Sequence, residues 1–296
     1  MVKAGGIEDV IFSPERPRDL YHYSSCSGIL AIVSSRQLWA SDIDSLNDAK
    51  EQLHAVDVMA HSIENFLFRA GRQGGDVSGR VARKLFDSGM GRKALGNCVC
   101  SFSEQGDLLS QWRAYGADGR GISIGFNSNL LERDFIAAGF RLGKVIYSYD
   151  LQYKLCNSFI NEAFPGFDWS IEVEEIPDAV LLKIEKFLNY FGAFFKHSAF
   201  ADEREWRAVS GENHLYSDDW RFRATQRGLA SYIEVPLPSV FSRESEAIGQ
   251  EFQPHFGFTT GPKVRPKPTH NILQAITYQI LGKGYGVSLS GAPYID

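Results

Sequence analysis

The chain has 296 residues, of which 44% are hydrophobic and 23% are charged, the balance of an ordinary soluble globular protein. Its 31 Lys and Arg residues against 36 Asp and Glu residues give a formal net charge of -5, which argues against a protein built to coat nucleic acid or an anionic membrane. No apolar run approaches the ~20 residues needed to cross a bilayer, and the first residues lack the apolar stretch of a signal peptide. We therefore expect a cytoplasmic protein without membrane contact.

The first half of the chain alternates between short strands and helices. The pattern over 19–25 predicts a strand with Leu20 and His22 on one face and Tyr21 and Tyr23 on the other. Apolar spacing and turn residues predict the elements that follow. Strands are expected at 37–41, 97–103 and 121–127, and helices at 27–35, 48–70, 80–93 and 107–116.

The second half mixes strands and helices without strict alternation, which predicts an α+β fold rather than a parallel α/β sheet. The whole chain, 1–296, is expected to form one domain with helical insertions at about 48–95 and 151–200. Strands are expected at 143–150, 232–238, 252–258 and near the end of the chain, and the apolar run 208–210 is expected to start a further strand. Helices are expected at 151–163, 177–195 and 270–281.

Few residues of this sequence have the spacing of a metal or phosphate site. The four cysteines, at positions 26, 98, 100 and 156, include one C-x-C pair with no second pair or His cluster, so reduced thiols are expected rather than zinc ligands. Neither GxGxxG nor a Walker-type sequence is present.

Three acids fall within four positions of the stretch 196–207, KHSAFADEREWR. They are Asp202, Glu203 and Glu205, beside Trp206 and Arg207. Carboxylates this close repel one another unless cations or a ligand offset their charge. On an extended backbone Glu203, Glu205 and Arg207 would share one face, so we expect both glutamates to look into one cleft with Trp206 packed behind them. A charged surface turn with one buried tryptophan is the alternative.

Taken in order, these motifs resemble the ADP-ribosyltransferase superfamily. A strand that carries His, a strand with a Ser and aromatic signature, and Glu followed by an aromatic residue at a strand entrance are shared with it. More closely, the chain resembles a bacterial family long labelled as a domain of unknown function. The motifs are LYHY at 20–23, LND..E at 46–51, SFS at 101–103, W..Y at 112–115, ExEWR at 203–207 and SxxPY at 290–294.

The resemblance implies a split β-sheet core, with two small antiparallel or mixed sheets around a cleft that binds NAD. It also implies cleavage of the bond between ribose and nicotinamide through an oxocarbenium-like transition state. By this resemblance Glu205 stabilises the positive charge and holds the ribose 2′-hydroxyl, and Glu203 engages the acceptor. His22 would hydrogen-bond a ribose hydroxyl or the nicotinamide amide. A core histidine bonded to the backbone is the alternative for His22.

The other residues expected to contact NAD lie on the same motifs. Either Tyr115 or Trp112 would stack on nicotinamide, with helix packing as the alternative for both. Phe102 stands where a tyrosine is expected, and Arg207 would pair with an acid or reach a phosphate. For Asn47, Asp48 and Glu51 of the LND..E motif, capping of a helix is the alternative to a role in the site. The full set is Tyr23, Ser101, Phe102, Ser103, Trp112, Tyr115 and Arg207, besides His22.

The resulting hypothesis is an NAD-dependent ADP-ribosyltransferase that modifies an intracellular macromolecule without a metal. The acceptor is a nucleic acid or a protein, and a toxin or phage-defence role would bring an antitoxin or defence-system partner. The basic segment 69–93 favours nucleic acid, unless its charges only solvate helix faces. The alternatives are a metal-dependent nuclease or hydrolase that uses Asp202, Glu203 and Glu205, and a non-catalytic nucleotide-binding sensor.

Overall fold

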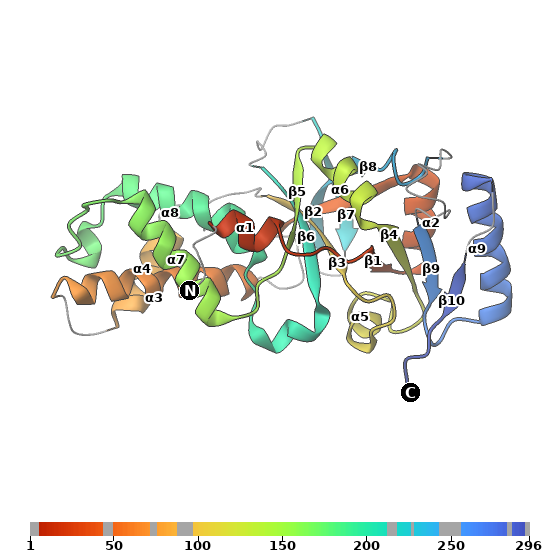
Figure 1. The fold of residues 1–296 in the computed structure, drawn as a ribbon, viewed down its shortest axis with the longest axis horizontal. Helices are drawn as coiled ribbons and strands as arrows, with labels where there is room; N and C mark the ends of the chain where they lie inside the picture. Colours follow the sequence, from red (N-terminus) through yellow and green to blue (C-terminus); the bar gives the residue numbers. More distant parts are fainter. Residues whose placement is uncertain are drawn as a thin grey trace.

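The computed structural model describes residues 6–43, 50–71, 76–87, 97–211, 218–225, 228–242, 256–282 and 286–293. The fold is mixed α+β, with an open mixed sheet and helices at both of its ends (Figure 1). The strands are β1 (Asp19–Ser24), β2 (Gln37–Asp42), β3 (Cys98–Ser103), β4 (Ile122–Asn127), β5 (Phe140–Lys144), β6 (Glu205–Ser210), β7 (Trp220–Thr225), β8 (Gly228–Pro236), β9 (Phe256–Thr260) and β10 (Val287–Leu289).

The sheet branches at β3. The path β10-β9-β4-β1-β3-β2-β8-β7 runs through it, and β6 and then β5 are added on the other edge of β3. β1 pairs with β3 at Tyr21 and Ser103, whereas β2 pairs with it at Ser41–Val99 and Asp42–Cys98. Because β6 occupies the opposite edge, β1 and β2 use the same edge of β3 at its two ends. The sheet therefore divides between β1 and β2.

Four helices form a helical lobe at one end of the molecule, on the left in Figure 1, and α9 lies at the other end beside β9 and β10. The lobe comprises α3, α4, α7 and α8, which come from the two expected insertions. The helices are α1 (Ile7–Phe12), α2 (Cys26–Ser35), α3 (Lys50–Arg69), α4 (Val77–Leu85), α5 (Leu109–Ala114), α6 (Ser128–Ala137), α7 (Tyr149–Ala163), α8 (Asp178–Phe191) and α9 (Pro266–Leu281), with short 3-10 turns at Val173–Glu175, Gly192–Phe194 and Ser198–Glu203. None of the helices in the described ranges combines the length and the apolar character required to cross a bilayer.

The two faces of β3 and β6 are buried against different cores. Val99 and Val209 belong to the core of the helical lobe, and we call their side of the sheet the lobe face. Phe102 and Trp206 belong to the second core, which includes Phe135 of α6, and we call that side the α6 face. Alternation of side chains along each strand assigns every residue of β3 and β6 to one of these faces.

Most of the elements expected from the sequence are confirmed within a few residues. The strand expected at 143–150 is wrong, because β5 ends at Lys144 and the hydroxyl of Ser148 accepts from the Leu151 N–H to begin α7. β9 covers 256–260, so the strand expected at 252–258 is confirmed over its last three residues, and 252–255 lie outside the described ranges. The sequence interpretation missed α1, α6 and β7, although the Asn127 side chain caps α6 in an ordinary way.

Candidate functional site

Strand pairing lines up the SFS and ExEWR motifs at the centre of the sheet. Ser103 pairs with Glu205 on one side and with Tyr21 on the other, and Ser101 pairs with Arg207. Paired residues of antiparallel strands project to the same side. Ser101, Ser103, Glu205 and Arg207 therefore all lie on the lobe face.

Two acids and two cations form a buried group there, which we call the ion-pair cluster: Lys196, Glu203, Glu205 and Arg207. The Lys196 Nζ donates to Glu203 Oε2 at 2.6 Å and to Glu205 Oε2 at 2.9 Å. The Arg207 guanidinium donates through Nε to Glu205 Oε1 at 2.7 Å and through Nη2 to Oε2 at 3.0 Å. The formal charges of the four side chains cancel, which reduces the cost of burying them.

The backbone brings the two glutamates together by a route that differs from the expected one. Residues 203–207 are not extended throughout, because a 3-10 turn ends at Glu203 and Arg204 is left-handed with φ 46°. Both glutamates nevertheless reach the same ammonium group, that of Lys196. The expectation that Trp206 packs behind them is confirmed, since its side chain is fully buried in the core on the α6 face.

The carboxyl group of Glu205 is held in its ionised form. Glu205 is 5% exposed, and burial alone would raise its pKa. The charges of Arg207 and Lys196, with hydrogen bonds from Arg207 and Ser101, lower the pKa to about 2 instead. Glu205 is therefore an ionised carboxylate at any physiological pH.

His22 lies where β1 leaves β3. Its Nδ1 is 3.1 Å from the backbone oxygen of Ser101, and because a carbonyl can only accept, Nδ1 is the protonated nitrogen. Burial lowers the pKa of His22, the bond to Ser101 opposes this, and the charge of Arg223 lowers the pKa further. The imidazole is thus neutral, with Nε2 as an acceptor for which the described part of the chain supplies no donor.

Glu205 and His22 meet the same residue from different sides. Glu205 bonds with the Ser101 side chain, whereas His22 bonds with the Ser101 carbonyl. Because Tyr21 shares the face of Glu205, the next residue, His22, leaves toward the α6 face, where its ring lies 6.0 Å from that of Phe102. Both side chains therefore contact Ser101, but these contacts do not make Glu205 and His22 face one another across a shared cavity.

The two residues expected to stack on nicotinamide differ sharply in exposure. Trp112 is fully buried, and its Nε1 donates to Asp107 Oδ1 at 2.7 Å, so helix packing accounts for it. Tyr115 follows α5 and is 44% exposed, which leaves its ring accessible.

The remaining expected contact residues are mostly occupied by packing or by backbone bonds. The Tyr23 hydroxyl donates to the Gln105 carbonyl and accepts from the Leu108 N–H. Phe102 is buried in the core on the α6 face, and Ser103 Oγ donates to the Glu203 carbonyl. Ser103 thus braces the backbone at the first acid of ExE.

Other predicted features fall away from this site or outside the described ranges. Residues 46–48 of the LND motif lie outside them, as does Tyr294, and so does the Glu51 side chain. On α4, Arg80 pairs with Glu174 at 3.4 Å and Lys84 donates to the Glu174 carbonyl, so part of the basic segment serves the helical lobe. In the ranges that the structure describes, no group of three or more His, Cys, Asp or Glu residues has the arrangement of a metal site.

The sequence interpretation missed two residues that hold the acids, Lys196 and Tyr147. Lys196 was part of the acidic stretch but had no assigned role, and it is only 2% exposed. Tyr147 accepts the Glu205 backbone N–H at 2.9 Å. The signal for Lys196 was its place directly after the apolar run FGAFF, where a lysine is buried only if it is paired.

Residues 111–208 match a family model described as "Protein of unknown function (DUF2971)". This is less than half of the chain and runs from α5 to β6. It therefore includes Trp112, Tyr115 and the ion-pair cluster, but neither His22 nor Ser101. The match agrees with the expected resemblance to a domain-of-unknown-function family. Searches of curated proteins and of solved structures gave no significant match.

Proposed function

We propose that this protein is an NAD-dependent ADP-ribosyltransferase with Glu205 as its charge-stabilising residue. The observation that carries the proposal is the connection at Ser101, where the ionised Glu205 bonds the side chain and the neutral His22 bonds the carbonyl. The residues that the resemblance names for chemistry and for ribose binding thus adjoin one residue of the SFS motif.

Glu205 suits the stabilisation of an oxocarbenium-like transition state. Cleavage of the ribose–nicotinamide bond develops positive charge on the sugar, which a fixed negative group stabilises without reorganising. The bidentate contact with Arg207 holds the carboxylate in place. Glu203 offsets the charge of Lys196, so that the two cations do not give the ion-pair cluster a net positive charge.

His22 suits recognition of a hydrogen-bond donor. Because its Nδ1–H is used by Ser101, the Nε2 lone pair accepts either from a ribose hydroxyl or from the nicotinamide amide. Its lowered pKa keeps this lone pair available near neutral pH.

The proposed position of the substrate is the division of the sheet between β1 and β2. His22 of β1 and Glu205 of β6 lie on different faces of the sheet, so a ligand reaches both only around the edge of β3 that β1 and β2 leave open between them. A divided sheet supports the proposal, because the superfamily resemblance implies two sheets around an NAD cleft.

Release of nicotinamide from labelled NAD, and transfer of the label to cell lysate, test the proposal. The wild-type chain should do both, and Glu205→Gln should lower the rate by about 100-fold or more, the usual effect of removing one stabilising group. Glu174→Gln, an exposed acid on the helical lobe, is the matched control and should keep the wild-type rate. Absence of release by the wild type, or an equal rate in Glu205→Gln, would contradict the proposal.

A non-catalytic nucleotide sensor is a second candidate, favoured by the same ion-pair cluster. Both oxygens of Glu205 already accept hydrogen bonds, as in a structural ion pair. A sensor would bind NAD in a calorimetric titration and return it unchanged. The metal-dependent hydrolase has less support, because an ammonium and a guanidinium group occupy the acids that would have to bind a divalent cation.

A further inference from the structure

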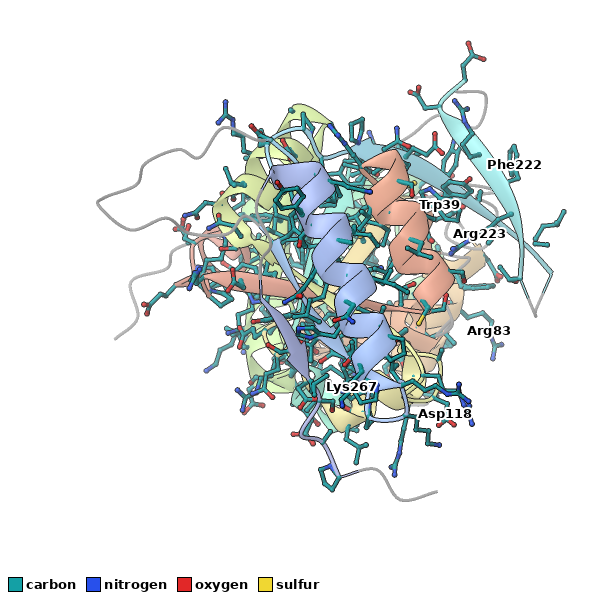
Figure 2. The ribbon with its side chains drawn as sticks, turned by 90° about the vertical axis from the view of Figure 1, so that its right-hand side faces the viewer. Trp39, Arg83, Asp118, Phe222, Arg223 and Lys267 are labelled. Carbon is teal, nitrogen blue, oxygen red and sulfur yellow. The ribbon has the colours of Figure 1, made fainter. Side chains whose placement is uncertain are left out.

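Strands β2, β8 and β7 carry a partly exposed group of two aromatic rings and a cation, which we call the Trp39–Tyr232–Arg223 platform. The two ring centroids are 4.5 Å apart with an interplanar angle of 31°. The guanidinium carbon of Arg223 lies 5.6 Å from the Trp39 ring and 5.8 Å from the Tyr232 ring. Figure 2 shows Trp39 and Arg223 side by side at the β7–β8 hairpin, with Phe222 directed away from them.

Strand register places the platform on the same face of the sheet as Glu205. Ser41 pairs with Val99, which lies on the lobe face, and also with Tyr232. Trp39, two residues before Ser41, has the same orientation, and so does Arg223, which pairs with Ala230 two residues before Tyr232. Trp39 also stands level with Ser101, two residues beyond the Ser41–Val99 pair, where β2 and β3 no longer pair.

The donors of Arg223 are only partly used. Its Nη2 donates to Ser41 Oγ at 2.9 Å, while Nε is buried without an acceptor in the described ranges. Its Nη1 has no acceptor in those ranges and is not buried, so it is open to solvent. Leaving guanidinium donors unpaired costs stability, and such groups in native proteins call for an explanation.

The rest of the platform is also prepared for a ligand rather than for the core. The Trp39 side chain is 39% exposed although its ring is fixed against Tyr232. Glu234 pairs with Trp39 in strand register and lies 3.8 Å from Arg221, so its charge is offset. The platform thus presents an aromatic surface and a net positive charge at the same place.

We propose that the Trp39–Tyr232–Arg223 platform binds a nucleoside phosphate, with the base stacked on Trp39 and the phosphate on Arg223. This rests on the proposed function, in which the ligand is the adenosine phosphate half of NAD and the reactive ribose lies toward Ser101. Bases stack on aromatic side chains with about 1–3 kcal/mol each, and arginine binds phosphate through charge-assisted hydrogen bonds. The influence of Arg223 on the pKa of His22 agrees with a platform that adjoins the same opening.

The test is calorimetric titration of the full chain with ADP-ribose and with AMP. Both should bind the wild type, and Arg223→Gln and Trp39→Leu should each weaken binding by about 10-fold or more. Phe222→Ala is the matched control, since Phe222 is exposed, adjoins Arg223 and lies on the other face of β7. Circular dichroism spectra and melting temperatures establish that each variant is folded.

The outcomes separate this inference from the proposed function. Loss of binding in Arg223→Gln and Trp39→Leu, without nicotinamide release by the wild type, would support the platform and refute the transferase. The platform is refuted if neither ligand binds the wild type or if both variants bind as the wild type does. It is also refuted if a single-stranded oligonucleotide binds while AMP does not.

Discussion

Replacing Glu205 by glutamine removes one charge from the buried ion-pair cluster while keeping the shape of the side chain. The pKa of Glu205 falls from its ordinary value of 4.5 to about 2 in the folded chain. At about 1.4 kcal/mol per pKa unit, this difference corresponds to about 3 kcal/mol of stability near pH 6. Removal of one partner of a buried ion pair typically costs a similar amount, about 3–5 kcal/mol.

The pH dependence follows from the sign of the shift. Because the folded-state pKa is lowered, the contribution of Glu205 is complete above the unfolded-state value of 4.5 and is lost as the pH falls toward about 2. Two-state linkage gives a loss of about 2 kcal/mol between about pH 6 and about pH 3. Over this pH interval, the difference in free energy of unfolding between the wild type and Glu205→Gln should therefore fall by about 2 kcal/mol.

Urea unfolding followed by tryptophan fluorescence measures both quantities. Glu174→Gln, which is exposed, should differ from the wild type by about 0.5 kcal/mol or less at either pH. A Glu205→Gln variant as stable as the wild type near pH 6, or a stability difference that does not change with pH, would refute the view that Lys196 and Arg207 hold an ionised carboxylate.

Two further substitutions test how the site is supported. Gln152 is fully buried and donates to the carbonyls of Ile146 at 2.6 Å and Lys196 at 3.0 Å. Gln152→Leu should therefore lower the free energy of unfolding, measured in urea, by about 1–3 kcal/mol. A change below about 0.5 kcal/mol would show that these bonds do not hold Lys196. A Cβ on Gly121 would lie 2.1 Å from the Ser24 carbonyl oxygen, so Gly121→Ala should lower the melting temperature. Gly211→Ala is the control and should keep the wild-type melting temperature, because a Cβ there would have no atom within 4 Å. Equal melting temperatures of the two variants would contradict the steric argument.

The local patterns of this chain predicted its elements well where one physical signal dominated. The LYHY and SFS strands alternate apolar and polar residues, and β1 and β3 begin and end within a residue or two of the expected positions. The apolar spacing of the second insertion predicted α8 as a helix. The failures came where signals competed, as in 143–150, where β-forming residues precede a serine that caps the next helix.

The candidate site was predictable in composition but not in arrangement. Density of acids identified Glu203 and Glu205, and repulsion between them implied cations nearby. The apolar run before Lys196 indicated a paired lysine, but nothing local indicated that both glutamates share it. A left-handed Arg204 and the 3-10 turn before it decide which way Glu203 faces. Trp39 and Arg223 are 184 residues apart, and only the pairing of β2 with β8 and of β8 with β7 brings them together.

By itself, the sequence determined the mixed α+β class, the strands that carry His22, Ser101 and Glu205, and the need to neutralise a dense group of carboxylates. These follow from periodicity and charge, which act between neighbours along the chain. Only the tertiary structure decided that β1 and β2 share one edge of β3. It also decided that His22 and Glu205 approach Ser101 from different faces of the sheet. The reason is that register and strand order depend on which distant segments bury their apolar faces together, and no local pattern encodes that choice.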